Sequence, residues 1–349
     1  MLKTSKFLLV LIMVAGVMAP LFANGQDEAA DYDYVLGKVP YTFEHAYHQA
    51  VAKELTSYAK QMYNAKVVVV DGQASNEKTL AAVENLVAQG VDAIELHCGD
   101  AGLMTTAINI AHEAGIPIVT TLIRPTEMMA PHVQPQETPS SLTMGQIAAT
   151  QWLKANPDKP CKVAMLNFGG IEQIWQMRTG AFFDGVKSID PSAELVTMLN
   201  GAGSTVTSME VTLDILQANP EVNIIFAAND EMALGALAAC EQLGRGVMDN
   251  GVPLTEVIAG LDGSEAAMLE IYDPSSSFKM THGAVRDVAR AEIDTMMAIV
   301  KGEIPMDKYM ETPVLSPVVD FYNTPIEEAQ RFLETNFFYE GDLKAEIKK

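Results

Sequence analysis

The sequence has few cysteines and few basic residues, and both shortages exclude classes of protein. Its 349 residues include three cysteines, which are too few and too scattered for a disulfide framework or a four-ligand zinc site. A single bridge between Cys161 and Cys240 stays open. Lysine and arginine number 23 against 45 acidic residues, a formal net charge of −22. This charge repels nucleic-acid backbones and anionic membrane surfaces, so we expect no nucleic-acid partner.

Motifs that mark many enzymes and cofactor-binding proteins are also missing. The chain has no glycine-rich phosphate loop ending in Lys-Ser/Thr, no dinucleotide fingerprint, no Gly-x-Ser-x-Gly turn and no His-Glu-x-x-His pair. His45 and His48 lie three positions apart and could share a helix face, but no third ligand follows at a diagnostic spacing. The sequence therefore predicts no catalytic residue, no cofactor and no metal site.

A single long apolar run is present, and it lies at the N-terminus. Lys3 and Lys6 precede an apolar segment that ends at Ala23 before a polar break. This pattern is typical of a secretory signal peptide over residues 1–23, because the run is shorter than the roughly 20 residues that span a bilayer comfortably. The absence of a cysteine near Ala23 predicts an exported protein without a lipid anchor. An uncleaved membrane anchor is the alternative.

Beyond this segment, short apolar runs alternate with segments of helical periodicity. The runs are nearly continuous, as in parallel strands that are buried on both faces. Nine such strands exceed what one open sheet usually holds, so the sequence predicts an α/β fold of two doubly wound parallel-sheet lobes. We expect the first crossing between the lobes at 128–141, which is rich in proline, glutamine and serine. The expected strands are 34–39, 66–70, 92–97, 117–122, 162–168, 194–199, 222–227, 255–261 and 278–282.

Polar and aromatic side chains follow most of these strands. Ligands of open parallel sheets bind beyond the carboxyl ends of the strands, and two facing sheets form a cleft there. Aromatic rings in such a cleft can stack on a small ligand, while polar groups hydrogen-bond it. The candidate ligand-binding residues are Glu44, Tyr47, His48, His97, Arg178, Asn229, Asp262 and His282.

Several of these residues also have a purely structural interpretation, which the sequence leaves open. Asn229 stands before two acidic residues, a pattern typical of a capped helix N-terminus. Asp262 precedes a glycine and a serine, as in a turn followed by a cap. On the same structural interpretation, His97 would be a buried histidine with satisfied hydrogen bonds, and Arg178 would be a surface arginine.

Four segments resemble the ribose and galactose branch of the type I periplasmic solute-binding proteins. The densest match is VNIIFAANDEMALGALAACEQLG at 222–244, followed by GLDG at 260–263, VDAI at 91–94 and AGIPIV at 114–119. The resemblance extends over residues 34–315. It implies two lobes joined by three crossings, which close over one ligand and present it to the permease of an ABC transporter.

The resemblance also implies a division of the chain and a function. The N-terminal lobe would comprise 24–139 plus 283–312, and the C-terminal lobe 140–282 plus 313–349. The protein would be a periplasmic monomer and not an enzyme, and it would bind a monosaccharide or related polyol. Whether it also informs a chemoreceptor stays open.

Three candidate residues match the family position by position. Arg178, inside Met177-Arg178-Thr179-Gly180-Ala181-Phe182, falls at an arginine that hydrogen-bonds sugar oxygens in the family, and Asn229 and Asp262 match an asparagine and an aspartate that contact sugar hydroxyls there. We therefore expect alanine at each position to weaken ligand binding more than folding.

Other candidate positions differ from the family. The first loop keeps an aromatic residue at Tyr47 but has Glu44 and His48 as its polar residues, while His97 and His282 replace an asparagine and a glutamine. The fourth expected strand also lacks the family's terminal aspartate. These differences leave another pentose, a sugar acid, a polyol or a nucleoside-like molecule open as ligand. The imidazoles of His97 and His282 further predict pH-dependent affinity, because histidine changes charge near pH 6 to 7.

Two other functions are alternatives to ligand capture. An exported hydrolase on the same scaffold would use Glu44 or Asp262 together with a histidine, and ligand recovered unchanged from the protein would argue against it. The effector half of a transcription regulator is disfavoured, because the chain opens with a leader and has no basic helix-turn-helix.

Overall fold

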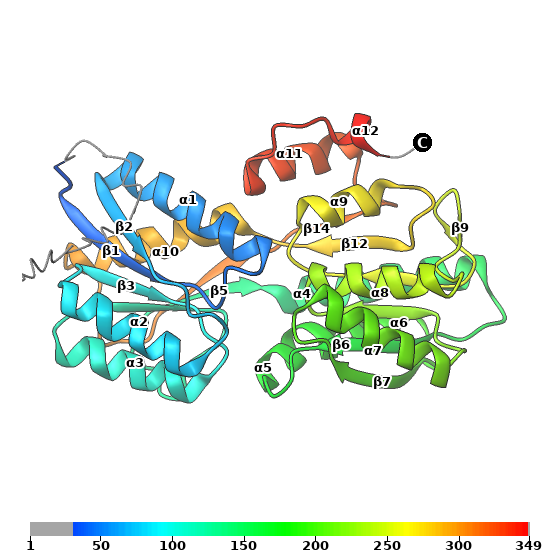
Figure 1. Cartoon of the computed structure of the whole chain (residues 1–349), viewed down its shortest axis with the longest axis horizontal. Coiled ribbons are helices and arrows are strands. Elements are labelled where there is room, and N and C mark those ends of the chain that lie inside the picture. The colour runs from blue at the N-terminus through cyan, green and yellow to red at the C-terminus, as the bar shows by residue number, and fades with distance from the viewer. Residues whose placement is uncertain (1–30, 348–349) are drawn as a thin grey trace, which may run out of the picture. The chain divides into compact units, whose positions relative to one another are not determined.

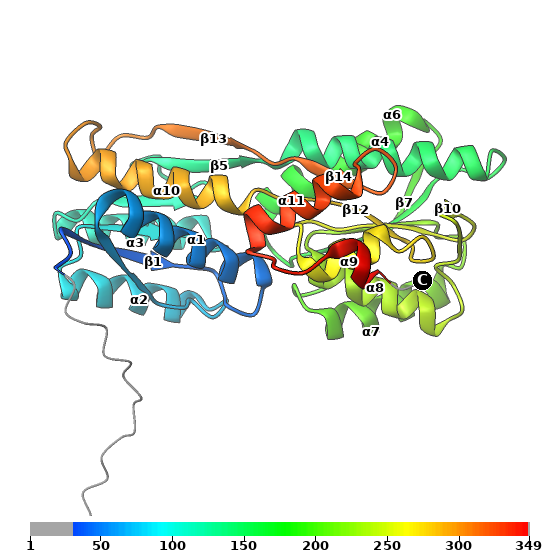
Figure 2. The ribbon, with the colours of Figure 1, turned by 90° about the horizontal axis from the view of Figure 1, so that it is seen from above.

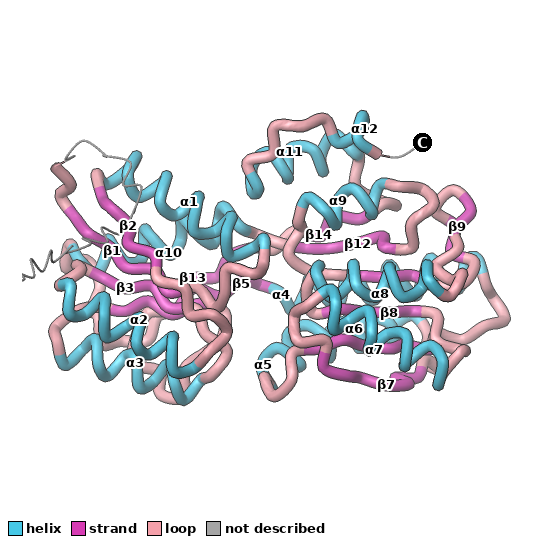
Figure 3. Tube along the Cα trace, viewed as in Figure 1, coloured by secondary structure: helices cyan, strands magenta, loops and turns pink. Residues whose placement is uncertain are grey.

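A computed structural model of the protein describes residues 31–347. From Asp33 onward the chain forms one compact unit, in which two six-stranded sheets are each covered by helices on both faces (Figures 1 and 3). The expected signal peptide at 1–23 lies outside the described residues. Within the described part, no helix is both long enough and apolar enough to cross a membrane.

The first sheet has the strand order β13-β5-β4-β3-β1-β2, and all its pairings are parallel. Helices α1 (Ala46–Tyr63) and α10 (Val285–Val300) pack together over one face, and α2 (Asn76–Gln89) and α3 (Ala101–Glu113) cover the other. The strands are β1 (Tyr34–Val39), β2 (Ala65–Val69), β3 (Ala93–Leu96), β4 (Ile118–Thr121), β5 (His132–Gln136) and β13 (Glu311–Leu315).

The second sheet has the order β14-β12-β11-β8-β6-β7. Its pairings are parallel except that β14 runs antiparallel to β12. The strands are β6 (Lys162–Asn167), β7 (Glu194–Asn200), β8 (Ile224–Ala227), β11 (Val257–Ala259), β12 (Phe278–His282) and β14 (Val318–Asp320), and β9 (Met248–Asp249) and β10 (Val252–Pro253) form a separate hairpin. The helices are α4 (Glu137–Ala155), α5 (Glu172–Ile174), α6 (Ala181–Ile189), α7 (Thr205–Ala218), α8 (Asp230–Gln242), α9 (Glu265–Tyr272), α11 (Ile326–Phe337) and α12 (Leu343–Glu346). A π-helical turn, η1 (Trp175–Gly180), joins α5 to α6.

The helix ends follow from local sequence. Ser75 and Asp100 precede α2 and α3, and their side chains accept hydrogen bonds from the backbone N–H groups of Lys78 and Leu103 at 3.4 and 2.8 Å. Such bonds satisfy donors that the first helical turn leaves unpaired. Gly90 ends α2 in the left-handed conformation, with φ of 67°, which glycine adopts without a steric penalty.

The predicted fold class and all nine expected strands are confirmed. The chain passes between the sheets three times, from β5 to β6, from β12 to β13 and from β13 to β14; Figure 2 shows β5 and β13 running together toward the second lobe. The segment expected as the first crossing, 128–141, contains β5 and the start of α4. Strand β13 continues beyond residue 312, and the expected lobe boundaries stay a prediction.

The structure shows whether Cys161 and Cys240 form the disulfide that the sequence left open. Cys98, Cys161 and Cys240 are all buried free thiols, so the bridge between the last two is not formed. The second lobe is therefore held by packing, hydrogen bonds and ion pairs.

Candidate functional site

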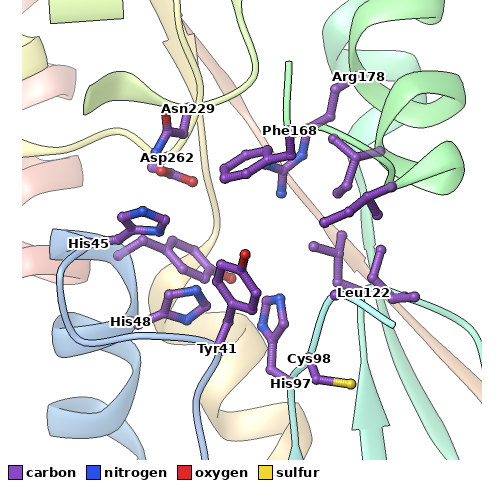
Figure 4. A pocket seen from close by; sticks show the side chains of 15 residues that line it. Tyr41, His45, His48, His97, Cys98, Leu122, Phe168, Arg178, Asn229 and Asp262 are labelled. Carbon is purple, nitrogen blue, oxygen red and sulfur yellow. The ribbon is translucent and has the colours of Figure 1, made fainter. Parts of the chain in front are cut away.

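A cavity lies between the two lobes, where the carboxyl ends of strands from both sheets meet (Figure 4). The space between its lining atoms amounts to about 470 Å³, part of which is open solvent. Its lining residues are Tyr41, His45, Tyr47, His48, His97, Cys98, Gly99, Leu122, Ile123, Phe168, Ile171, Ile174, Arg178, Asn229 and Asp262.

Imidazole and phenol rings form the side that the first lobe contributes, which we call the first-lobe wall: Tyr41, His45, Tyr47, His48 and His97. His45 and His48 are stacked with ring centroids 5.8 Å apart, and His48 meets His97 edge-on at 4.7 Å. His45 directly precedes α1, but its side chain makes no capping hydrogen bond. Its imidazole is therefore not engaged by the helix and reaches the cavity.

The histidines of this wall are held in their neutral form. Burial lowers the pKa values of both His48 and His97 well below the usual value. For His97 the next cause is the positive charge of Lys38, which pairs with Glu95 and Glu292 in the buried interior of the first lobe. The His48 Nδ1 atom is buried and has no hydrogen-bond partner within the described chain. A neutral imidazole offers one donor and one acceptor, so the wall can hydrogen-bond a ligand without carrying charge.

Arg178 is the charged residue on the opposite side of the cavity, and other protein groups already bind it. Its Nε and Nη2 atoms donate to the two carboxylate oxygens of Glu137 at 2.7 and 2.8 Å, and Nη1 donates to the Ala228 carbonyl at 2.7 Å. Glu137 is the first residue of α4, directly after β5, so the first crossing orients the guanidinium. Five N–H donors are available on arginine, and those that remain can serve a ligand.

Asn229 both caps a helix and lines the cavity. Its Oδ1 atom accepts the Met232 N–H at 3.0 Å and so caps α8. Its Nδ2 atom donates to Glu231 Oε2 at 2.8 Å and to the Gly203 carbonyl at 3.3 Å. The same side chain lines the cavity, so the helix cap fixes the direction in which the amide faces a ligand.

Asp262 faces the cavity from the loop between β11 and α9. Its φ is 124°, a conformation that residues other than glycine rarely adopt. Such backbone strain typically amounts to roughly 1–3 kcal/mol and concentrates at functional sites. Burial raises the pKa of the carboxyl well above its usual value, and the carboxylates of Glu231 and Asp230 raise it further. Asp262 can therefore hold a proton under conditions in which an exposed aspartate is ionised.

Two candidate residues do not line the cavity. The ring of His282 is fully buried between the hydroxyls of Ser141 and Ser316, at 3.2 Å from Nε2 and 2.9 Å from Nδ1. It joins the crossing segments by hydrogen bonds, and a ligand contact there stays a prediction. Burial lowers the pKa of His282 to about 3. Glu44 is exposed in the turn before α1, where its backbone N–H donates to the Thr42 hydroxyl at 3.2 Å, and the adjacent His45 faces the cavity instead.

Several lining residues and the partner of Arg178 are not among the candidate residues. Tyr41, His45 and Phe168 follow strands β1 and β6, so their position at strand ends was a usable signal. Glu137 gave no local signal, because its contact with Arg178 depends on how α4 packs against η1. No group of three or more histidine, cysteine, aspartate or glutamate side chains between residues 31 and 347 is arranged to hold a metal ion.

Comparison with known proteins identifies related sequences. The model of the family described as "Periplasmic binding protein domain" matches residues 36–304. The ribose import binding protein RbsB of Bacillus subtilis (strain 168) is 27% identical over 266 residues, which cover 76% of this chain and 81% of that protein. The putative rhizopine-binding protein of Rhizobium meliloti is 25% identical over 294 residues, covering 83% and 91%.

Solved structures share the fold. The Caulobacter myo-inositol binding protein bound to myo-inositol matches with a TM-score of 0.73 at 18% identity, over 86% of this chain and 97% of that one. A periplasmic solute binding protein of an ABC transporter from Actinobacillus succinogenes, with bound D-allose, matches with a TM-score of 0.68 at 24% identity, over 85% and 99%. Because the family model spans most of the chain and the two-lobed fold agrees with it, the chain belongs to the periplasmic binding protein family.

Proposed function

We propose that this protein captures a monosaccharide or related polyol in the cavity between its lobes and delivers it to the permease of an ABC transporter. The observation that carries the proposal is the convergence of Arg178, Asn229 and Asp262 with the first-lobe wall on one cavity. These three residues come from separate segments of the second lobe, and the wall adds neutral imidazoles opposite them.

The lining matches the chemistry of a hydroxylated ligand. A sugar hydroxyl donates one hydrogen bond and accepts others, so its site needs both kinds of partner. Arg178 supplies donors, and the Asp262 carboxyl and the neutral imidazoles supply both donors and acceptors. The rings of Tyr41 and Phe168, whose centroids lie 6.5 Å apart, offer apolar faces for the carbon-bound hydrogens of a sugar ring.

The related proteins support this ligand class. The ligands in the names and structures given above include ribose, myo-inositol and D-allose, which are small molecules rich in hydroxyl groups. The role in import is supported in the same way, by a relative named as a ribose import binding protein and by a neighbour from an ABC transporter. We extend both statements to this chain as a proposal.

Transport would follow from a shift between open and closed arrangements of the lobes. A ligand favours closure by the free energy with which it binds the closed state better than the open one. The Glu137–Arg178 pair connects the cavity with the start of α4 at the first crossing. We propose a periplasmic monomer without its leader, whose closed form the permease recognises. Signalling to a chemoreceptor is not part of this proposal.

The hydrolase alternative loses one of its two acids. Glu44 is exposed and does not line the cavity, so it could not act there beside a histidine. Asp262 remains as the acidic group at the site. Incubation of purified protein with a bound sugar, followed by mass spectrometry, should return the sugar unchanged.

One experiment tests the proposed function as a whole. Protein purified without added ligand is denatured, the released small molecules are identified by mass spectrometry, and the compound found is titrated back by calorimetry. We expect a monosaccharide or polyol that binds with a stoichiometry of one. A released compound without hydroxyl groups that binds the refolded protein would contradict the proposed ligand class.

A further inference from the structure

The cavity has an aliphatic side that the proposed function does not yet use. Leu122 and Ile123 reach it from the end of β4, and Ile171 and Ile174 from the segment around α5. We call these four residues the aliphatic wall. Leu122, Ile123 and Ile174 are all buried. In Figure 4, Leu122 lies across the cavity from His45, Asn229 and Asp262, so the aliphatic wall faces these three polar side chains.

Direct hydrogen bonds between the lobes hold the two halves of this wall together. The Gln173 side chain accepts the Arg124 backbone N–H at 2.9 Å and donates to the Arg124 carbonyl at 2.9 Å. Gln173 lies between Ile171 and Ile174 in sequence, and Arg124 directly follows Ile123. The reciprocal pair therefore fixes both aliphatic segments at the same place. The aliphatic wall is complete when the lobes are in contact there.

The backbone is specialised at the same place. Leu122 has a φ of 66°, which is a genuine outlier for a bulky residue. A Cβ atom added at Gly99 would lie 2.9 Å from the Ile171 Cδ1 atom, so glycine leaves the space that this side chain occupies. A strained leucine and a glycine that makes room for an isoleucine indicate that the aliphatic wall is a formed part of the site.

The consequence for a ligand follows from desolvation. A hydroxyl that faced the aliphatic wall would lose its water on closure and find no hydrogen-bond partner, which is unfavourable. A methyl group in the same place would gain by leaving water. The wall would therefore distinguish a sugar with a methyl group facing it from a sugar with a hydroxymethyl group in the same place.

Building on the proposed function, we infer that the ligand is a deoxy sugar, whose alkyl carbon packs against the aliphatic wall while its hydroxyls face Arg178, Asn229, Asp262 and the imidazoles. The aliphatic wall is then the specificity-determining part of the site. The polar side would bind many sugars, and the wall selects those with a methyl group in place of a hydroxymethyl group.

Calorimetric titration with matched sugars tests this inference. The pairs are L-rhamnose and L-mannose, L-fucose and L-galactose, D-fucose and D-galactose, and 6-deoxy-D-glucose and D-glucose, with D-ribose and myo-inositol added. We expect a methyl-bearing member to bind most tightly in the set, by roughly tenfold to a hundredfold over its hydroxymethyl partner. Tightest binding of a fully hydroxylated sugar would overturn the inference and leave the proposed function intact. Binding of no compound in the set would overturn both.

A substitution separates the wall from the rest of the site. Ile123→Thr places a hydroxyl in the wall, and it should lower the ratio of affinities within the preferred pair at least severalfold. Ile189→Thr makes the same change at a side chain that is 40% exposed on α6 and should leave the ratio unchanged. Equal ratios in wild-type protein and both variants would overturn the role of the wall, provided that thermal melting shows all three proteins folded.

Discussion

The two sides of the cavity that carry polar groups differ in how those groups are held. In the first-lobe wall the rings contact one another, and the His48 Nδ1 atom lacks any described partner. On the second-lobe side Arg178 and Asn229 are fixed by short hydrogen bonds to Glu137, the Ala228 carbonyl and the Met232 N–H. The side chains of the first-lobe wall are neutral and keep unused hydrogen-bonding capacity, whereas those of the second-lobe side are largely hydrogen-bonded to other protein groups.

This difference indicates how the work of the site is divided. Groups that are already paired are oriented before a ligand arrives, so they can define its position at little further cost in entropy. Neutral imidazoles with spare hydrogen-bonding capacity can adapt to the pattern of hydroxyls. Substitutions that remove these paired contacts should therefore change both folding and binding, and substitutions that keep them should separate the two.

The largest effect is expected for Arg178→Ala. The side chain is 7% exposed, and its loss leaves the buried Glu137 carboxylate without its partner, which typically lowers the free energy of unfolding by about 3–5 kcal/mol. Ligand affinity should fall as well. Chemical denaturation without ligand measures the first effect and calorimetry the second.

This expectation replaces the sequence-based one, in which alanine at this position would weaken ligand binding more than folding. The double variant Arg178→Met/Glu137→Gln removes both charges and is the matched control, which should recover much of the stability and none of the affinity. A loss of less than about 1 kcal/mol in the single variant would mean that the pair behaves like an exposed ion pair.

The next largest effect concerns His282, which the structure moves from the cavity to the crossing segments. The unfolded chain binds a proton at this imidazole near pH 6.5, whereas the folded chain does so near pH 3. The unfolded state therefore holds more protons between these values, and His282 lowers the free energy of unfolding as the pH falls through this window. Above pH 6.5 this contribution is absent.

His282→Asn measures this contribution directly. The variant's loss of free energy of unfolding, relative to wild-type protein, should be largest at pH 7.5. It should shrink by roughly 1.4 kcal/mol for each pH unit below 6.5. Other titrating groups cancel in the difference between the two proteins. A cost independent of pH from 7.5 to 4.5 would contradict the burial of a neutral imidazole at this position.

Asp262→Gly should separate folding from binding in opposite directions. Glycine relieves the positive φ at this position and removes a buried carboxyl, which together should raise the free energy of unfolding by about 1 kcal/mol. Loss of the carboxyl should weaken binding of the identified sugar by roughly fivefold to a hundredfold. Thermal melts and calorimetry on the same samples measure both.

Asp262→Asn is the matched control, because it keeps the strained backbone and a polar group. It should not melt at a higher temperature than wild-type protein. If the glycine variant were less stable than the asparagine variant, the strain at Asp262 would be disproved.

The smallest effect on folding is expected for Asn229→Ser. Serine keeps an oxygen that can accept the Met232 N–H but loses the bonds that Nδ2 donates to Glu231 and the Gly203 carbonyl, so the free energy of unfolding should fall by about 0.5–1 kcal/mol. The carboxamide that lines the cavity is lost, and affinity should fall severalfold. Asn229→Ala removes the cap too and should cost about 1 kcal/mol more. If serine restored full affinity, Asn229 would be a helix cap and not a ligand contact.

The sequence predicted the sheets well where the strands are buried and continuous. All nine expected strands exist. Most are central parallel strands, which are apolar on both faces and stand out from their flanks, while β2 and β7 lie at sheet edges. The strands that were missed are short or unusual: β5 and β13 contain Pro135 and Pro313, and β14 is an antiparallel edge strand. Proline made 128–141 resemble a linker. Pro135 lies past His132 and Val133, the residues of β5 that pair with β4, and Pro313 lies on the edge strand β13, where proline is tolerated.

The site was predictable only as far as strand ends reveal it. Tyr47, His48, His97, Arg178, Asn229 and Asp262 were expected there and all line the cavity. Whether they contact a ligand stays a prediction. The burial of His282 and the Glu137–Arg178 pair could not be predicted, since both depend on how α4 packs in the second lobe. Spacing along the chain carries no information on such distant pairings.

The central claim is that one hydroxylated ligand occupies the cavity between the lobes, and a crystal structure of the protein with its best-binding sugar tests it most directly. The account predicts the ligand within hydrogen-bonding distance of Arg178, Asn229 and Asp262, with at least one imidazole of the first-lobe wall on its opposite side. A sugar bound elsewhere, with Arg178 and Asp262 contacting water alone, would contradict it.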